Sequence, residues 1–178
     1  MIDLDAPCGR HFVYRDLVEC GETYHREATT CPIDNLPRDP GTLEALGEVC
    51  RLLLDPVVDA FGAVRLTYGF ASPRLTRRIK GRIAPELDQH AGCERGRSGG
   101  LVCGRGGVAV DFLVPGVGGD DLARWVIEHA PFDRLYYYGA DRPIHVSVGP
   151  EQRRDVVLMR ASSKGTGRLI PSRYKGTF

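Results

Sequence analysis

Apolar residues recur at helical spacing in one long stretch of the chain. Within residues 42–58 they follow one another at steps of three and four, which is typical of an amphipathic helix. Thr42 is a suitable N-cap, because its hydroxyl can accept a backbone N–H in the first turn. Pro56 lacks a backbone N–H, so we expect a kink or a break at Asp55-Pro56. This stretch is predicted to be the main core helix.

Shorter apolar runs, bounded by glycine, proline or aspartate, predict four strands. They cover residues 63–68, 108–114, 135–138 and 144–148. A second helix is expected between the middle two strands, capped by Asp120 or Asp121. Strands flanked by helices in this way predict a single α+β domain, in which a small, mainly antiparallel sheet packs on helices.

The two ends of the chain lack this patterning. Residues 1–40 contain one or two helical turns after Arg15 and a loop punctuated by prolines over residues 21–40, so we expect an N-terminal lobe packed on the core, residues 41–158. Residues 159–178 are basic and rich in glycine and serine, and they predict a flexible tail. Because clustered Lys and Arg release counterions on binding a polyanion, nucleic acid or another anionic polymer is a candidate partner for the tail.

Composition is that of an ordinary globular protein. The 178 residues include 24 Lys and Arg against 23 Asp and Glu, a net charge of +1, so no overall field directs the chain to nucleic acid or to a membrane. No apolar run approaches the roughly 20 residues that span a bilayer, and the N-terminus has no signal-peptide pattern. The expected location is the cytoplasm, with no membrane partner.

Six cysteines are present, and in the cytoplasm we expect them as free thiols. A second, structural zinc is an alternative interpretation for the cysteines and histidines near the N-terminus, although their spacing fits no zinc template. These residues are Cys8, His11, Cys20, His25 and Cys31.

Three residues in or near the predicted strands have side chains that bind metals. His90 precedes the strand that carries Asp111, and His145 lies in the last predicted strand. Two imidazoles and one carboxylate form a usual zinc set that leaves a fourth position for water. No short ligand pair such as HExxH is present, so spacing alone does not fix the geometry.

Four short motifs occur in order along the chain. They are Gln89-His90, Gly107-Val108-Ala109-Val110-Asp111, Phe132-Asp133-Arg134-Leu135 and Ile144-His145-Val146-Ser147. This order resembles the M15 family of zinc D-Ala-D-Ala carboxypeptidases and phage endolysins, whose fold is shared with the hedgehog signalling domain. The resemblance covers roughly residues 11–150. It implies the hedgehog/DD-peptidase fold, one zinc ion on His90, Asp111 and His145, and hydrolysis of a peptide or a related amide.

The chain departs from the family pattern at residues that the family uses for catalysis. The arginine that helps to hold the substrate carboxylate is replaced by Ala71, with other arginines one turn further on. The general base three residues before the final histidine is replaced by Arg142, which leaves Asp141 as the candidate base. Other branches of the family carry a glutamate where this chain has Tyr138.

The largest departure lies between the first two ligands. His90 and Asp111 are 111 − 90 = 21 residues apart, further than in the family, and the extra segment, residues 91–106, is rich in glycine and arginine. Such a composition predicts a mobile loop. It is either a surface insertion or a lid in which Arg95 and Arg97 bind an anionic substrate.

These departures leave other functions open. Cys93 or Cys103 could enter the metal shell. The chain could instead be a zinc-binding module that has lost catalysis, or a metalloenzyme for phosphoesters or nucleotides. In both alternatives the arginine-rich loop and the tail contact an anionic partner.

Overall fold

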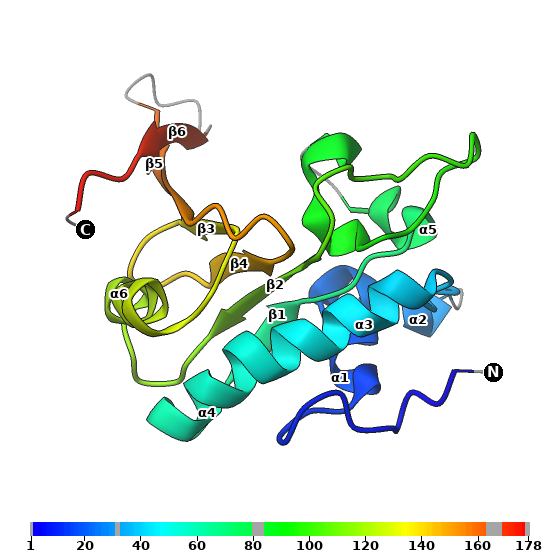
Figure 1. Cartoon of the computed structure of the whole chain (residues 1–178), viewed down its shortest axis with the longest axis horizontal. Coiled ribbons are helices and arrows are strands. Elements are labelled where there is room, and N and C mark those ends of the chain that lie inside the picture. The colour runs from blue at the N-terminus through cyan, green and yellow to red at the C-terminus, as the bar shows by residue number, and fades with distance from the viewer. Residues whose placement is uncertain (1, 31–32, 80–83, 163–168, 177–178) are drawn as a thin grey trace.

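The computed structural model describes residues 2–30, 33–79, 84–162 and 169–176 (Figure 1). The helices within these ranges are α1 (Tyr14–Val18), α2 (Glu22–Thr30), α3 (Pro40–Val49), the π-helical η1 (Cys50–Leu54), α4 (Asp55–Phe61), α5 (Pro73–Thr76), the 3-10 turns η2 (Pro85–Leu87) and η3 (Gln89–Ala91), and α6 (Gly119–His129). The strands are β1 (Arg65–Tyr68), β2 (Val108–Leu113), β3 (Arg134–Tyr137), β4 (Ile144–Val148), β5 (Asp155–Ala161) and β6 (Leu169–Arg173).

These strands form one sheet in the order β1-β2-β4-β3-β5-β6. Only β3 and β5 pair in parallel, and the other four neighbouring pairs are antiparallel. The predicted α+β class with a small, mainly antiparallel sheet is therefore confirmed.

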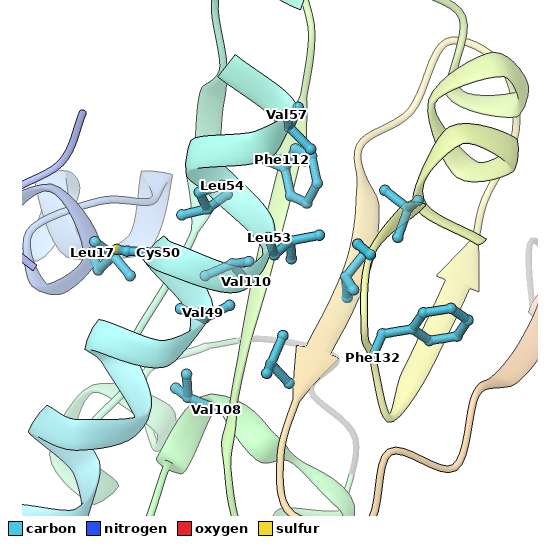
Figure 2. Packing of buried hydrophobic residues seen from close by; sticks show 14 of the residues in the cluster. Leu17, Val49, Cys50, Leu53, Leu54, Val57, Val108, Val110, Phe112 and Phe132 are labelled. Carbon is cyan, nitrogen blue, oxygen red and sulfur yellow. The ribbon is translucent and has the colours of Figure 1, made fainter. Parts of the chain in front are cut away.

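Helices cover one face of this sheet. Figure 2 shows Val108, Val110 and Phe112 along β2, beside Val49 and Leu53 of the long helix, and all five side chains are buried. Helix α6 packs over β3 and β4 on the same apolar cluster. Because successive side chains of a strand point to opposite faces, the residues between these core positions face the other side of the sheet.

The long helix begins at a different residue from the one predicted, and it continues past Pro56 without a break. Its N-cap is Asp39, whose side chain accepts from Gly41 N at 2.9 Å, and the predicted cap Thr42 is buried one turn inside. The chain stays helical through Pro56, preceded by the π-helical segment η1. A wider turn at this point accommodates a proline that cannot donate to the preceding turn.

Three other predictions need correction. Gly118, not Asp120 or Asp121, is the N-cap of α6. Residues 22–30 form helix α2 instead of a loop. This helix is polar, so its sequence contains no apolar stripe from which a helix could be predicted. Part of the predicted flexible tail is ordered, because its first residues complete β5 and Leu169–Arg173 pair with that strand as β6.

The start of the arginine-rich segment is anchored to α3. Glu94 is only 4 % exposed, and its Oε1 accepts from the backbone N–H groups of Arg38 and Asp39 at 2.9 and 3.0 Å and from Thr42 Oγ1 at 2.9 Å. A carboxylate at a helix N-terminus satisfies donors that have no partner within the helix. The residues next to His90 are thereby tied to the core helix.

Candidate metal centre

Two of the three predicted ligands are direct cross-strand neighbours. Asp111 of β2 is opposite His145 of β4, and cross-strand partners project from the same face of a sheet. Tyr68 of β1 pairs with Asp111, and Tyr136 of β3 pairs with His145, so the four residues form one row across the sheet. This row lies on the face opposite the helical core.

The third ligand comes from the 3-10 turn η3, which packs on β2. Asp88 caps this turn, and its Oδ1 accepts from His90 N at 3.1 Å. The carbonyl of His90 accepts from Ala71 N at 2.9 Å. These two backbone contacts hold the buried His90 against the row of strand residues.

The ligand atoms of the three residues converge on one point. His90 Nε2 lies 3.2 Å from His145 Nδ1 and 3.2 Å from Asp111 Oδ1, and His145 Nδ1 lies 2.8 Å from the same carboxylate oxygen. The structure therefore brings together the residues that the sequence predicted as ligands, and no other such group occurs among the described residues.

The tautomer of His90 is fixed by the chain that follows β1. His90 Nδ1 lies 2.8 Å from the carbonyl oxygen of Gly69, and since a carbonyl only accepts, Nδ1 carries the proton. Gly69 needs to be glycine, because a Cβ there would lie 2.2 Å from the Leu17 carbonyl oxygen. The lone pair of a neutral His90 is thus on Nε2, directed at the other two ligands.

This arrangement calls for a shared cation. Burial alone would raise the pKa of Asp111, but the attraction and hydrogen bonds of the two imidazoles hold its pKa below the ordinary value, so it is a carboxylate. Burial lowers the pKa of His90, but Asp111, Asp88 and the Gly69 carbonyl together raise it by more, so its pKa lies above the ordinary value. Three electron-pair donors at these distances repel one another unless a proton or a metal ion lies among them.

The donor set fits zinc. Ligands about 2.0–2.1 Å from a tetrahedral zinc are about 3.3 Å apart, so the separations of 2.8 to 3.2 Å need to widen by only a few tenths of an ångström. The hydrogen bond from His90 to a backbone carbonyl is the kind of outer contact that orients metal-binding histidines.

Tyrosines surround the three ligands. The Tyr68 ring lies 4.2 Å from the ring of His90, and the Tyr136 ring lies 5.1 Å from that of His145, measured between centroids. Burial, followed by the charge of Asp111, raises the pKa of Tyr138. Tyr138 therefore keeps its phenolic proton at neutral pH.

The candidate base Asp141 lies elsewhere. It is an exposed residue of the loop between β3 and β4, and its charge raises the pKa of Tyr137, after burial and Asp120. Tyr137 packs on the helix-covered core, on the face opposite Tyr136. The same loop is tied to the first turn of α6 by the bond from Gly119 N to the Ala140 carbonyl oxygen, 2.7 Å. We therefore do not assign Asp141 to the metal centre.

The predicted substrate arginines line a cavity whose lining includes none of the three ligands. Arg95 and Arg97 line a cavity of about 530 Å³ together with Arg74 and Arg77 of the segment after Ala71. Arg95 also forms an ion pair with Asp39 Oδ2 at 3.3 Å. Neither contacts the three ligands, so their role in binding substrate stays a prediction.

Cys93 and Cys103 do not join the metal centre. Cys103 Sγ donates to the carbonyl of Glu86 at 3.3 Å, and Cys93 lies against the start of α3. No disulfide links the described cysteines. The closest pair, Cys8 and Cys50, has its sulfur atoms 2.9 Å apart in the core.

The second zinc site suggested for the N-terminal segment is not formed by its described members. His11 pairs with Asp59 at 2.9 Å, and Cys20 donates to the Leu17 carbonyl at 3.5 Å. Cys31 lies outside the described residues. These side chains have separate partners, and they do not converge on one point.

Sequence reasoning missed several residues around the ligands. The alternation of β3 places Arg134 and Tyr136 on the site face, a pattern hidden in the run of tyrosines after Leu135. The role of Asp88 was also not predicted, because it depends on the 3-10 turn η3 that this residue caps.

Comparison of the chain with protein-family models, curated proteins and solved structures gave no match. Within the described ranges, no helix has the length and apolar character required to cross a membrane. The function must therefore be argued from the residues themselves, and the feature that identifies the site is a buried His-Asp-His group suited to one metal ion.

Proposed function

We propose that this chain is a divergent zinc-dependent hydrolase of the M15 type, built on the hedgehog/DD-peptidase-like fold, that cleaves a peptide or a related amide. The observation that carries the proposal is the convergence of His90 Nε2, Asp111 Oδ1 and His145 Nδ1 within 3.2 Å of one another. The four motifs in their M15-like order support the same assignment.

Each residue has a separate task in this proposal. His90, Asp111 and His145 hold the metal, and the Gly69 carbonyl keeps His90 in the tautomer that can bind it. When bound in such an open site, zinc lowers the pKa of a water molecule to about 7 and polarises a carbonyl oxygen. This activation reduces the need for a carboxylate base at the position of Asp141.

Tyr138 is the proposed proton donor. Its pKa is raised by burial and by Asp111, so it is a neutral phenol at neutral pH, able to donate to the negative charge that develops on an amide under attack. The ring of Tyr136 packs edge-on against His145 on this side of the site.

The test is zinc-dependent hydrolysis of a dipeptide and tripeptide library, read by mass spectrometry. We expect activity that a chelator removes and zinc restores. Tyr138→Phe should lower kcat by about 100-fold, the usual cost of one oxyanion donor, whereas Tyr137→Phe, its neighbour on the opposite face, should change kcat far less. Asp141→Ala should stay within about twofold of the parent protein.

A second candidate is a zinc-binding module without hydrolytic activity, which contacts an anionic partner through the loop of Arg95 and Arg97 and the C-terminal segment. The exposed position of Asp141 favours it, because no contact of this expected general base with the three ligands is found among the described residues. Two results would support this alternative over the enzyme. The protein would bind stoichiometric zinc but hydrolyse no member of the library, and Tyr138→Phe would not change the affinity for a bound ligand.

A further inference from the structure

Arg134 is a buried cation on the same face of the sheet as the metal centre. It is 8 % exposed, and its backbone N–H donates to Ser147 Oγ at 3.1 Å. Arg134 is opposite Ser147 across the β3–β4 ladder, two pairs along from Tyr136 and His145 and on the same face of the sheet. Diagonal neighbours of this kind are about 7–8 Å apart, so Arg134 lies about two residue lengths of extended chain from the ligand His145.

Its charge has only a neutral partner. Arg134 Nη1 donates to Gln89 Oε1 at 3.2 Å, and no carboxylate among the described residues forms an ion pair with it. Asp155 lies opposite on β5, but its Oδ2 pairs with Arg153 Nε at 3.3 Å. Asp133 reaches Arg134 only through Gln89, whose Nε2 donates to Asp133 Oδ2 at 3.3 Å. A buried cation without an ion partner is costly, and an anionic ligand would offset that cost.

Arg134 also opens on a cavity. The space has a volume of about 470 Å³ and continues from Tyr136 over β5 to Arg173 of β6. A second arginine of its lining, Arg154, is already engaged, since its Nη1 donates to the Ala130 carbonyl at 3.0 Å and its guanidinium lies over the Phe132 ring. Volumes of about 300–1,000 Å³ are usual for small-molecule sites.

We infer that Arg134, oriented by Gln89, binds a carboxylate group of the substrate in this cavity. The planar guanidinium presents paired donors that match a carboxylate, and Gln89 occupies only one of its nitrogens. The separation of about 7–8 Å from His145 places that carboxylate within about two residues of the bond to be cleaved. This inference rests on the proposed function for its substrate, but the anion site itself exists without a metal.

The first experiment follows the Arg134 side chain in metal-free protein. The Nε–H resonance of Arg134 is assigned by its loss in Arg134→Gln, and succinate, neutral succinamide and inorganic phosphate are titrated separately. We expect saturable shifts with succinate and none with succinamide. Absence of a succinate shift would overturn the inference, and so would phosphate binding more than tenfold tighter than succinate.

The second experiment uses zinc-loaded protein and calorimetry with two hydroxamates, the monohydroxamate of succinic acid and its carboxamide analogue. The acid should bind about 10–100-fold tighter than the amide, the usual range for a charge-assisted hydrogen bond. Arg134→Gln should abolish this preference and Arg134→Lys should keep part of it. Arg124→Gln, an exposed arginine on α6 paired with Asp121, should keep all of it.

The outcomes separate the two proposals. Equal binding of both hydroxamates by the parent protein would overturn the carboxylate site while leaving the metal centre in place. If neither hydroxamate binds while succinate still shifts the Arg134 resonance, the zinc-hydrolase proposal is contradicted and the anion site is still supported. Zinc content and circular dichroism of each variant identify any loss that comes from unfolding.

Discussion

Replacement of His145 by alanine is expected to abolish zinc binding and hydrolysis together. His145 Nδ1 is the ligand atom closest to Asp111, at 2.8 Å, and its loss leaves only His90 and Asp111 to hold the metal. Because even outer-shell partners of metal ligands are worth 10–100-fold in affinity, we expect the zinc affinity to fall by more than about 100-fold. Competition with a chromophoric chelator measures this fall.

The matched control is His129→Ala. His129 ends α6, where its Nδ1 lies 2.9 Å from the Trp125 carbonyl oxygen. This helix covers the face of the sheet opposite the metal centre. Its replacement should leave zinc affinity and kcat/KM within about twofold of the parent protein. Equal zinc affinity in the His145 and His129 variants would show that the His-Asp-His group is a hydrogen-bonded cluster without a metal.

Replacement of Leu53 by alanine is expected to produce the largest loss of stability among single core changes in the long helix. Leu53 is 0 % exposed in the core between the helix and β2, as Figure 2 shows. Leu-to-alanine changes at such positions cost about 2.7–5 kcal/mol, because transfer energy is lost and a cavity remains. Urea unfolding followed by circular dichroism measures the free energy of unfolding directly.

Its neighbour provides the comparison. Leu52 belongs to the same π-helical turn but is 38 % exposed, so Leu52→Ala should cost less than about 1 kcal/mol. The difference between the two variants tests the rotation of the helix about its axis. Equal costs would mean that η1 does not present Leu53 to β2 as described.

The strands and the ligands could be predicted from the sequence because both follow local patterns. Ile144–Val148 was predicted with the bounds that the structure has, since a short β-branched run after a proline turn has few alternatives. Asp111 lies within such a run and His145 within another, so their meeting required only that the two strands pair. The convergence of His90 could not be derived from local pattern, because its position depends on long-range contacts with the Gly69 carbonyl and Ala71 N.

Other features were beyond the sequence because they depend on tertiary partners. Helix α2 has no apolar stripe, and β6 follows a segment rich in glycine and serine. The cap of α3 was placed three residues late, because Thr42 is engaged by Glu94 from a segment 52 residues away. The sequence does not show which residue is the partner of Arg134. Only the structure shows that this buried cation bonds to the neutral Gln89.

The most direct test of the central claim is the zinc content of the purified chain. The protein is stripped with a chelator, reloaded with excess zinc, freed of unbound metal and measured by elemental analysis beside an Asp111→Asn variant, which keeps the shape of the side chain but loses its charge. We expect about one zinc per chain in the parent protein and less than about one tenth of that in the variant. No zinc in the parent protein, or equal zinc in both, would contradict the assignment of His90, Asp111 and His145 as a metal centre.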